Sequence, residues 1–133
     1  METSGRVILL DSDVLIEVER ATPKAHAWIR SENSLEAAVP AAVALELVVG
    51  AGNQQEIARS QKFLQDFEVI PFQEGDFETA FSLAIQFRLS TGLSLPDFLI
   101  AAQALNRGAT LYTFNLRHFG AIAGLDARAP YER

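Results

Sequence analysis

The chain has 133 residues, of which 49% are hydrophobic and 21% charged, and it contains no cysteine. This size and composition predict one globular domain over residues 1–133 and exclude a disordered chain, disulfides, thiolate catalysis and cysteine-bound zinc. The sequence has no signal-like N-terminus and no apolar run of about 20 residues, so we expect a cytoplasmic protein that does not span a membrane.

The net charge of −6 is a second constraint. Proteins that bind nucleic acid through its phosphates use clustered Lys and Arg, so an acidic chain speaks against a broad nucleic-acid surface. Global charge is a weak guide, however, if several acidic residues belong to one metal site, because a divalent cation neutralises them there. The positions of the acidic residues therefore matter more than their number.

Strands and helices alternate along the predicted chain. In order, the sequence predicts a strand over 7–10, a helix over 23–30, a strand over 35–39, helices over 41–49 and 54–67, a strand over 68–72, helices over 77–90 and 96–107, a strand over 110–114 and a short edge strand within 127–133. Thr22, Asn53 and Asp76 mark helix starts as capping residues. Gly50 and Gly108 mark helix ends. This alternation predicts a three-layer α/β/α fold around a mainly parallel sheet.

Two aspartates interrupt the first apolar run, which reads Val-Ile-Leu-Leu-Asp-Ser-Asp-Val-Leu-Ile over residues 7–16. An isolated carboxylate in apolar surroundings shifts its pKa, finds a partner or binds a metal. Ligands of open α/β sheets bind at the carboxyl ends of the strands, and Asp11 and Asp13 follow the first strand directly. A helix-start cap is the structural alternative for Asp13.

Two further acidic residues are candidates for the same edge of the sheet. Glu46 lies within the apolar helix 41–49, where a solvent-facing position is the alternative interpretation. Asp97 follows Pro96 at the start of a helix, where an acid commonly serves as a cap or complements the helix dipole. If Asp11, Glu46 and Asp97 share one rim they repel one another, and a shared cation resolves the repulsion. Oxygen ligands without cysteine favour Mg²⁺ or Mn²⁺.

An apolar strand followed by Asp-x-Asp also resembles a phosphoaspartate phosphatase of the haloacid dehalogenase type. In that class the first aspartate, here Asp11, is the nucleophile. The class also needs a lysine for the phosphate, and the only lysines of this chain, Lys24 and Lys62, do not follow predicted strands. A phosphatase of this type is therefore the weaker interpretation.

Four segments together carry a family resemblance. They are Asp-Ser-Asp-Val-Leu-Ile (11–16), Leu-Glu-Leu-Val-Val-Gly (45–50), Pro-Asp-Phe-Leu-Ile-Ala-Ala (96–102) and Leu-Tyr-Thr-Phe-Asn-Leu-Arg-His-Phe (111–119). In order and spacing, over nearly the whole chain, they resemble a PIN domain, and more narrowly the VapC toxins of toxin–antitoxin pairs. The resemblance implies a Mg²⁺-dependent endoribonuclease that hydrolyses cellular RNA with an activated water, is silenced by a small antitoxin protein and forms a homodimer.

The resemblance also assigns roles to residues. Asp11, Glu46 and Asp97 match the three principal acidic residues that bind the metal, and Asp13 matches a supporting position.

The fourth acidic position departs from the fullest pattern, because many relatives have Asp where this chain has Asn115 or His118. Asn115 can still offer a carbonyl oxygen. Thr113 can orient a water or a neighbouring carboxylate, and Arg117 can contact a phosphate or a partner. The incomplete fourth position leaves open a PIN-like module that binds a partner and has weak catalysis.

Overall fold

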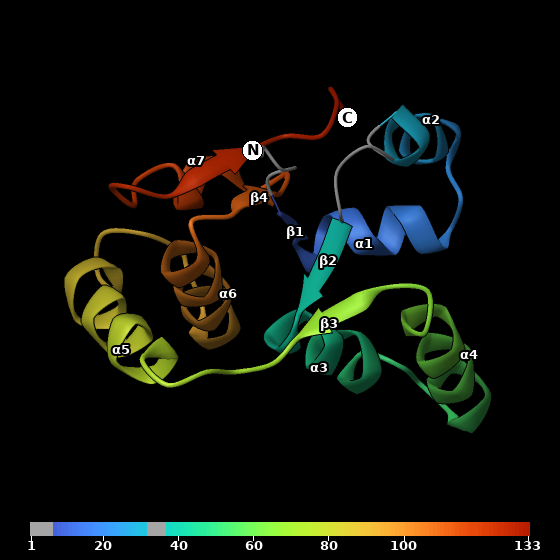
Figure 1. Cartoon of the computed structure of the whole chain (residues 1–133), viewed down its shortest axis with the longest axis horizontal. Helices are drawn as coiled ribbons and strands as arrows, with labels where there is room; N and C mark the ends of the chain where they lie inside the picture. Colours follow the sequence, from blue (N-terminus) through green and yellow to red (C-terminus); the bar gives the residue numbers. More distant parts are fainter. Residues whose placement is uncertain (1–6, 32–36) are drawn as a thin grey trace, which may run out of the picture.

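The computed structural model describes residues 7–31 and 37–133, and a parallel sheet forms its centre (Figure 1). Its five strands are β1 (Ile8–Leu10), β2 (Ala37–Pro40), β3 (Glu68–Ile70), β4 (Thr110–Tyr112) and β5 (Asp126–Arg128). They lie in the order β3-β2-β1-β4-β5, and every neighbouring pair is parallel. The carboxyl ends of all five strands therefore lie at one edge of the sheet.

The helices cover both faces of this sheet. They are α1 (Ser12–Glu19), α2 (Pro23–Ser31), α3 (Ala41–Val49), α4 (Gln54–Leu64), α5 (Asp76–Phe87), α6 (Leu95–Arg107) and α7 (Leu116–Phe119). Helices α1 and α2 lie on one side and α5 and α6 on the other (Figure 1). The chain runs outward from β1 to β3 and then crosses back to β4, so right-handed connections place the two sets of helices on opposite faces. The predicted three-layer α/β/α fold is confirmed.

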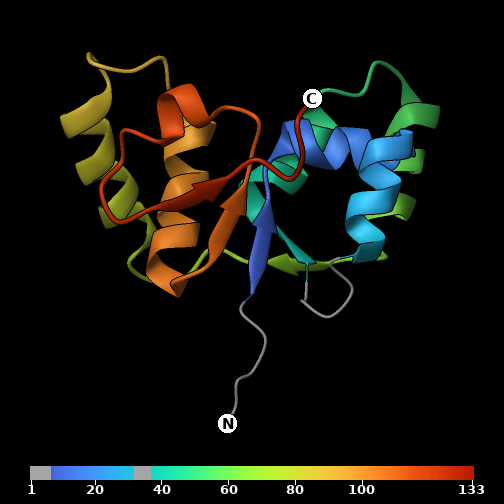
Figure 2. The same ribbon diagram turned by 90° about the horizontal axis from the view of Figure 1, so that it is seen from above.

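Strand β1 occupies the middle of the core. All three of its residues are at most 1% exposed, as expected for an apolar strand covered on both faces. Beside it, β4 runs in the same direction, and Figure 2 shows the blue and orange arrows of β1 and β4 ending at the same edge. Trp28 of α2 packs edge-on against Tyr112 of β4 with ring centroids 4.9 Å apart. Trp28 is 8% exposed and thus belongs to the core.

Several predicted boundaries differ from the structure. Helix α1 was not expected, and it begins immediately after β1 with Asp11 as its N-cap. Asp76 is the first residue of α5 rather than its cap, and Gly75 holds the N-cap position at φ 96°, which favours glycine. The predicted strand 35–39 is observed from Ala37, and its first two residues lie outside the described part. The edge strand near the C-terminus is confirmed as β5.

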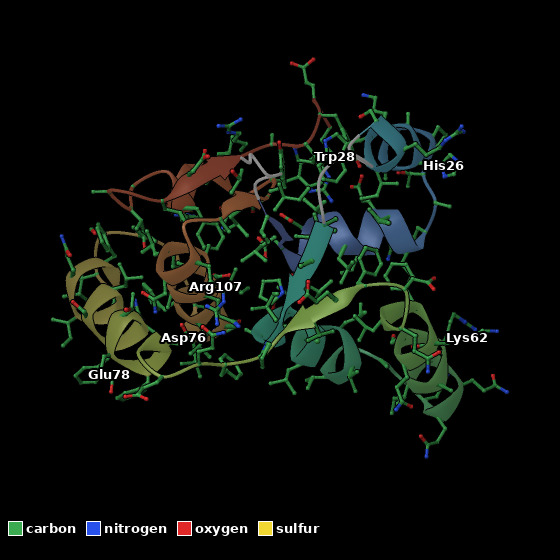
Figure 3. The ribbon with its side chains drawn as sticks, viewed as in Figure 1. His26, Trp28, Lys62, Asp76, Glu78 and Arg107 are labelled. Atoms are coloured by element: carbon green, nitrogen blue, oxygen red, sulfur yellow. The ribbon has the colours of Figure 1, made fainter. Side chains whose placement is uncertain are left out.

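A buried ion pair fixes α5 to α6. Asp76 is 2% exposed and accepts hydrogen bonds from Arg107 at 3.2 Å, Asn106 at 2.8 Å and the backbone N–H of Gln73 at 2.8 Å. Figure 3 shows Asp76 and Arg107 pointing toward one another between the two helices. Burial alone would raise the pKa of Asp76, but these hydrogen bonds outweigh it and hold the pKa below its usual range.

We expect Asp76→Ala to lower the free energy of unfolding by about 3 kcal/mol, because the change leaves the Arg107 guanidinium largely buried without its partner. Urea denaturation measures the loss. Glu74→Ala is the control, since Glu74 is an exposed acid two residues away and its loss should cost less than about 0.5 kcal/mol. Equal losses in the two variants would contradict this role of the ion pair.

No helix in residues 7–31 or 37–133 combines the length and apolar character needed to cross a membrane.

Candidate active site

Asp11 lies at the carboxyl end of β1, held from two directions. Its Oδ1 accepts the backbone N–H of Ser12 at 2.8 Å, and its Oδ2 accepts the hydroxyl of Thr113 at 2.7 Å. Thr113 follows β4, the parallel neighbour of β1, so the sheet itself brings the two residues together. Asp11 is 5% exposed and Thr113 is fully buried. The Asp11 carboxylate is therefore fixed in position inside the protein.

The electrostatic environment of Asp11 disfavours its charge. Burial is the main cause that raises the pKa of Asp11 to about 7, and the nearby charge of Asp13 raises it further. The charge of Asp97 acts in the same direction, whereas the hydrogen bonds from Thr113 and Ser12 act in the opposite one. A nearby cation would stabilise the charged form of this carboxyl group.

Asp13 lies in the first turn of α1 and contacts the segment after β4. Its Oδ2 accepts the backbone N–H of Phe114 at 3.1 Å, while its Oδ1 is buried without a hydrogen-bond partner. Burial raises the pKa of Asp13. The cap of α1 is Asp11, so the helix-start cap expected as the alternative for Asp13 is assigned to its neighbour instead.

Glu46 on α3 is half-buried and presents a second unpaired oxygen. Its Oε1 is buried without a hydrogen-bond partner, and among residues 7–31 and 37–133 Asp13 Oδ1 is the other such side-chain atom. Burial raises the pKa of Glu46, followed by the charges of Asp97 and Asp13, and the Ser12 hydroxyl partly offsets them. Both unpaired buried oxygens of the described chain thus belong to predicted site residues.

Asp97 in the first turn of α6 does take the role of a helix cap. Its Oδ2 accepts both the backbone N–H and the hydroxyl of Ser94 at 2.9 Å. The charge of Asp97 also raises the pKa values of Asp11 and Glu46. The sequence analysis did not identify Ser94, although Ser-x-x-Asp before an apolar helix is a recognisable capping pattern.

The remaining predicted residues lie on the segment after β4. The backbone N–H of Asn115 donates to the Thr113 hydroxyl at 2.9 Å, and Asn115 begins α7 half-buried. Arg117 is exposed on α7. His118 is fixed by a hydrogen bond from the backbone N–H of Gly92 to its Nδ1 at 3.0 Å. A side chain at position 92 would clash with the His118 ring, at 2.8 Å, so the glycine allows this close contact.

The donor set suits a hard divalent cation. Asp11, Asp13, Glu46 and Asp97 supply oxygen atoms. Burial raises the pKa values of the first three, and the charges of other site carboxylates raise those of Asp11 and Glu46 further. In the described residues, no three His, Cys, Asp or Glu side chains stand close enough together to hold a metal ion as they are. The unpaired oxygens of Asp13 and Glu46 nevertheless leave acceptors that an ion can satisfy.

A cavity of about 480 Å³ opens beside Glu46 between α1, α3 and α4. Its lining includes Arg20 and Arg59, the acidic residues Glu19 and Glu56, and apolar residues of α1 and α3. The candidate site therefore adjoins a cavity that carries both guanidinium and carboxylate groups.

Comparison with known proteins identifies the family. The sequence pattern of the PIN domain matches residues 8–125. This chain belongs to the PIN domain family. The PIN domain assignment covers every predicted acidic residue, and none of the curated proteins searched is similar enough to count as a relative.

Solved structures similar to this PIN domain include three from toxin–antitoxin systems. A toxin–antitoxin complex from Klebsiella pneumoniae is 25% identical, with 95% of this chain and 99% of that chain covered and a TM-score of 0.74. VapBC2 from Rickettsia felis, bound to a fragment of promoter DNA, is 19% identical with the same coverage and a TM-score of 0.81. DNA-bound VapBC from Salmonella typhimurium is 20% identical, again with that coverage, and has a TM-score of 0.80. The PIN domain expected from the sequence is confirmed.

Proposed function

We propose that this PIN domain is the toxin of a toxin–antitoxin pair and acts in the cytoplasm as a Mg²⁺-dependent endoribonuclease that hydrolyses phosphodiester bonds in cellular RNA. The observation that carries the proposal is the pair of buried side-chain oxygens without a hydrogen-bond partner, on Asp13 and Glu46, together with the raised pKa values of Asp11, Asp13 and Glu46. The PIN family and its toxin–antitoxin structural neighbours support the same reaction.

Asp11, Glu46 and Asp97 are the residues that would hold the ion, with Mn²⁺ as a substitute. When bound, the ion supplies a Lewis acid that polarises the phosphate and makes a water more acidic. Thr113 keeps the Asp11 carboxylate in one orientation, and Ser94 does the same for Asp97. Carboxylates that are already held in one orientation lower the reorganisation that the reaction requires.

Substrate contacts come from residues around this edge. Asn115 can present its side-chain carbonyl to the ion or to water, and Asp13 holds the Phe114–Asn115 backbone in place through its bond to Phe114. RNA phosphates can be contacted by the exposed Arg117. They can also be contacted by Arg20 and Arg59, which line the cavity beside Glu46.

Cleavage of total cellular RNA by the purified protein tests this function. We expect discrete cuts with Mg²⁺ that disappear with EDTA and in Asp97→Asn, with new RNA ends mapped by sequencing. Ser94→Ala is the control for helix capping, because it removes the hydroxyl bond to Asp97 but keeps the carboxylate.

Absence of cuts by folded protein in Mg²⁺ would favour a partner-binding module with weak catalysis, which is consistent with the spread of the carboxylates in the structure. In that case Asp11→Asn should keep its affinity for the partner. A trapped phosphate on Asp11 would instead support the phosphatase alternative.

A second copy of the chain and a small antitoxin are the proposed protein partners. Helix α5 and the residues after it expose a line of large apolar side chains at four-residue intervals: Phe77, Phe81, Ile85 and Leu89 are 66%, 57%, 72% and 96% exposed. The Phe77 and Phe81 rings stack with centroids 5.5 Å apart. A contiguous exposed apolar line of this kind marks an interaction surface, and we assign it to the homodimer.

We expect Phe81→Asp to convert the dimer into a monomer without unfolding the chain, because it puts a charge in the middle of this exposed line. Light scattering coupled to size exclusion measures the mass. Phe72→Asp is the matched control, since Phe72 is also exposed but lies before α5. A dimer that persists in Phe81→Asp would place the dimer interface elsewhere.

A further inference from the structure

Helix α3, which carries Glu46, begins without a cap from its own sequence. Its N-cap residue is Pro40, which has no side-chain hydrogen bond to offer the first turn. The first N–H groups of a helix have no partner within the helix, and such a group is costly when it is buried. The N–H of Ala42 is in this position, because Ala42 is 3% exposed.

Gln103 of α6 supplies the missing partner from another helix. Its side chain is completely buried, and its Oε1 accepts the N–H of Ala42 at 3.3 Å. Its Nε2 donates to the carbonyl of Ile70, the last residue of β3, at 3.0 Å. One amide therefore ties α6 to the start of α3 and to the carboxyl end of β3. Gln103 is not among the site residues identified from the sequence.

The helices that Gln103 joins each carry a proposed metal ligand. Ala42 and Glu46 are one helical turn apart and lie on the same face of α3, while Asp97 is in the first turn of α6. The two helices pack against each other near the end of β2 (Figure 1). The bond to Ala42 therefore fixes the register in which α3 presents Glu46 to Asp97.

A separate connection lies one turn further along α6. Arg107 donates to the backbone carbonyl of Gln103 at 2.8 Å and to that of Pro71 at 3.0 Å, and also pairs with Asp76. Figure 3 shows this pair beside α6. The Arg107–Asp76 pair holds the segment after β3 but makes no bond to α3, so the two connections can be separated by mutation.

From these contacts we infer that Gln103 is a positioning residue of the metal site: by capping α3 from α6 it sets Glu46 relative to Asp97 and thereby raises the affinity for Mg²⁺. This inference rests on the proposed function. Residues that orient metal ligands typically change metal affinity by about 10- to 100-fold when they are mutated. Because the amide acts through Glu46 and does not touch the ion, excess Mg²⁺ should compensate for its loss.

The test compares Gln103→Met, which keeps the length of the side chain but loses its hydrogen bonds to Ala42, Ile70 and Pro71, with Asp76→Asn as the matched control. MgCl₂ binding to each folded protein is measured by calorimetry. We expect binding about tenfold weaker than wild type in Gln103→Met and unchanged in Asp76→Asn. RNA cleavage by Gln103→Met should need more Mg²⁺ for half-maximal rate but reach the wild-type rate at saturation.

A second variant keeps the inference testable if Gln103→Met does not fold. Gln103→Glu retains an acceptor for the Ala42 N–H and loses the donor to Ile70, so its Mg²⁺ affinity should stay within about twofold of wild type. Wild-type affinity in Gln103→Met, or tenfold weaker binding in a folded Gln103→Glu, would overturn the role of the cap. If wild type itself binds no Mg²⁺, the proposed function fails and this inference fails with it.

Discussion

Asp11→Asn should lower the rate of RNA cleavage by at least about 100-fold while leaving the fold intact. The variant keeps an oxygen that can accept the Ser12 N–H, but it removes the charge that would help hold the cation. Loss of one fixed group that stabilises charge in the reaction commonly costs about 10²- to 10³-fold in rate. Single-turnover cleavage of an RNA with a mapped cut site, at saturating Mg²⁺, measures the loss.

Asp66→Asn is the matched control for this prediction. It makes the same chemical change and the same change in net charge at an exposed aspartate, far along the chain in the turn after α4. We expect its cleavage rate to be within about twofold of wild type, because exposed charges are screened and contribute little at a distance. If both variants retained full activity, Asp11 would have no part in the reaction.

The second large effect is on stability. We expect the contribution of Asp11 to the free energy of unfolding to fall as the pH rises, which is the opposite of ordinary acid denaturation. The folded-state pKa of Asp11 is raised from 3.8 to about 7, so between these values the folded protein binds a proton that the unfolded chain has released. Stability from this group is fully present below pH 3.8 and is lost as the pH rises through 7. Each pH unit in this window costs about 1.4 kcal/mol, so the loss between pH 5 and 7.5 is about 2.5 kcal/mol.

Urea denaturation of the metal-free protein in EDTA across pH 5 to 7.5 checks this expectation. The free energy of unfolding of Asp11→Asn should lack the pH dependence that Asp11 causes, and this variant should be more stable than wild type at pH 7.5. Raised pKa values of Asp13 and Glu46 act in the same direction, whereas the lowered pKa values of Glu17 and Asp76 act oppositely, so the difference between wild type and variant isolates Asp11. A wild-type profile that remains parallel to that of Asp11→Asn would contradict a raised pKa at this position.

The two effects have one physical cause. Asp11 is buried beside other carboxylates. When Asp11 is ionised, this placement destabilises the metal-free protein, and it also makes the binding of a cation more favourable. Adding Mg²⁺ should therefore stabilise wild type more at pH 7.5 than at pH 5, because the Asp11 carboxyl, with a pKa of about 7, is protonated at the lower pH and binds metal poorly.

The position of Asp11 could be predicted from the sequence, because it depends on a local pattern. Four apolar residues followed by two aspartates mark the end of a buried strand, and the structure places Asp11 there.

Helix α1 was missed for a local reason as well. Its sequence contains Val14, Ile16 and Val18, and such β-branched residues favour strands over helices. The Asp11 cap and packing against α2 and α3 prevail over that preference.

The surroundings of Glu46 and Asp97 depend on how distant helices pack, and no short pattern contains that information. The sequence left open whether Glu46 faces solvent, and its burial follows from the contacts of α3 with α1 and α6. Gln103 gave a signal that was not used, since it is one polar residue in the otherwise apolar run 98–105. Its partners Ala42, Ile70 and Pro71 could not be found without the structure.

Mn²⁺ titration followed by NMR tests the central claim most directly, because the paramagnetic ion broadens the signals of nuclei close to it. Substoichiometric Mn²⁺ should first broaden the backbone amide signals of Ser12, Asp13, Glu46 and Asp97, and excess Mg²⁺ should restore them. Signals of α5 should remain sharp. Broadening that begins elsewhere, or that survives unchanged in Asp11→Asn, would contradict a cation held by the carboxylates at the strand ends.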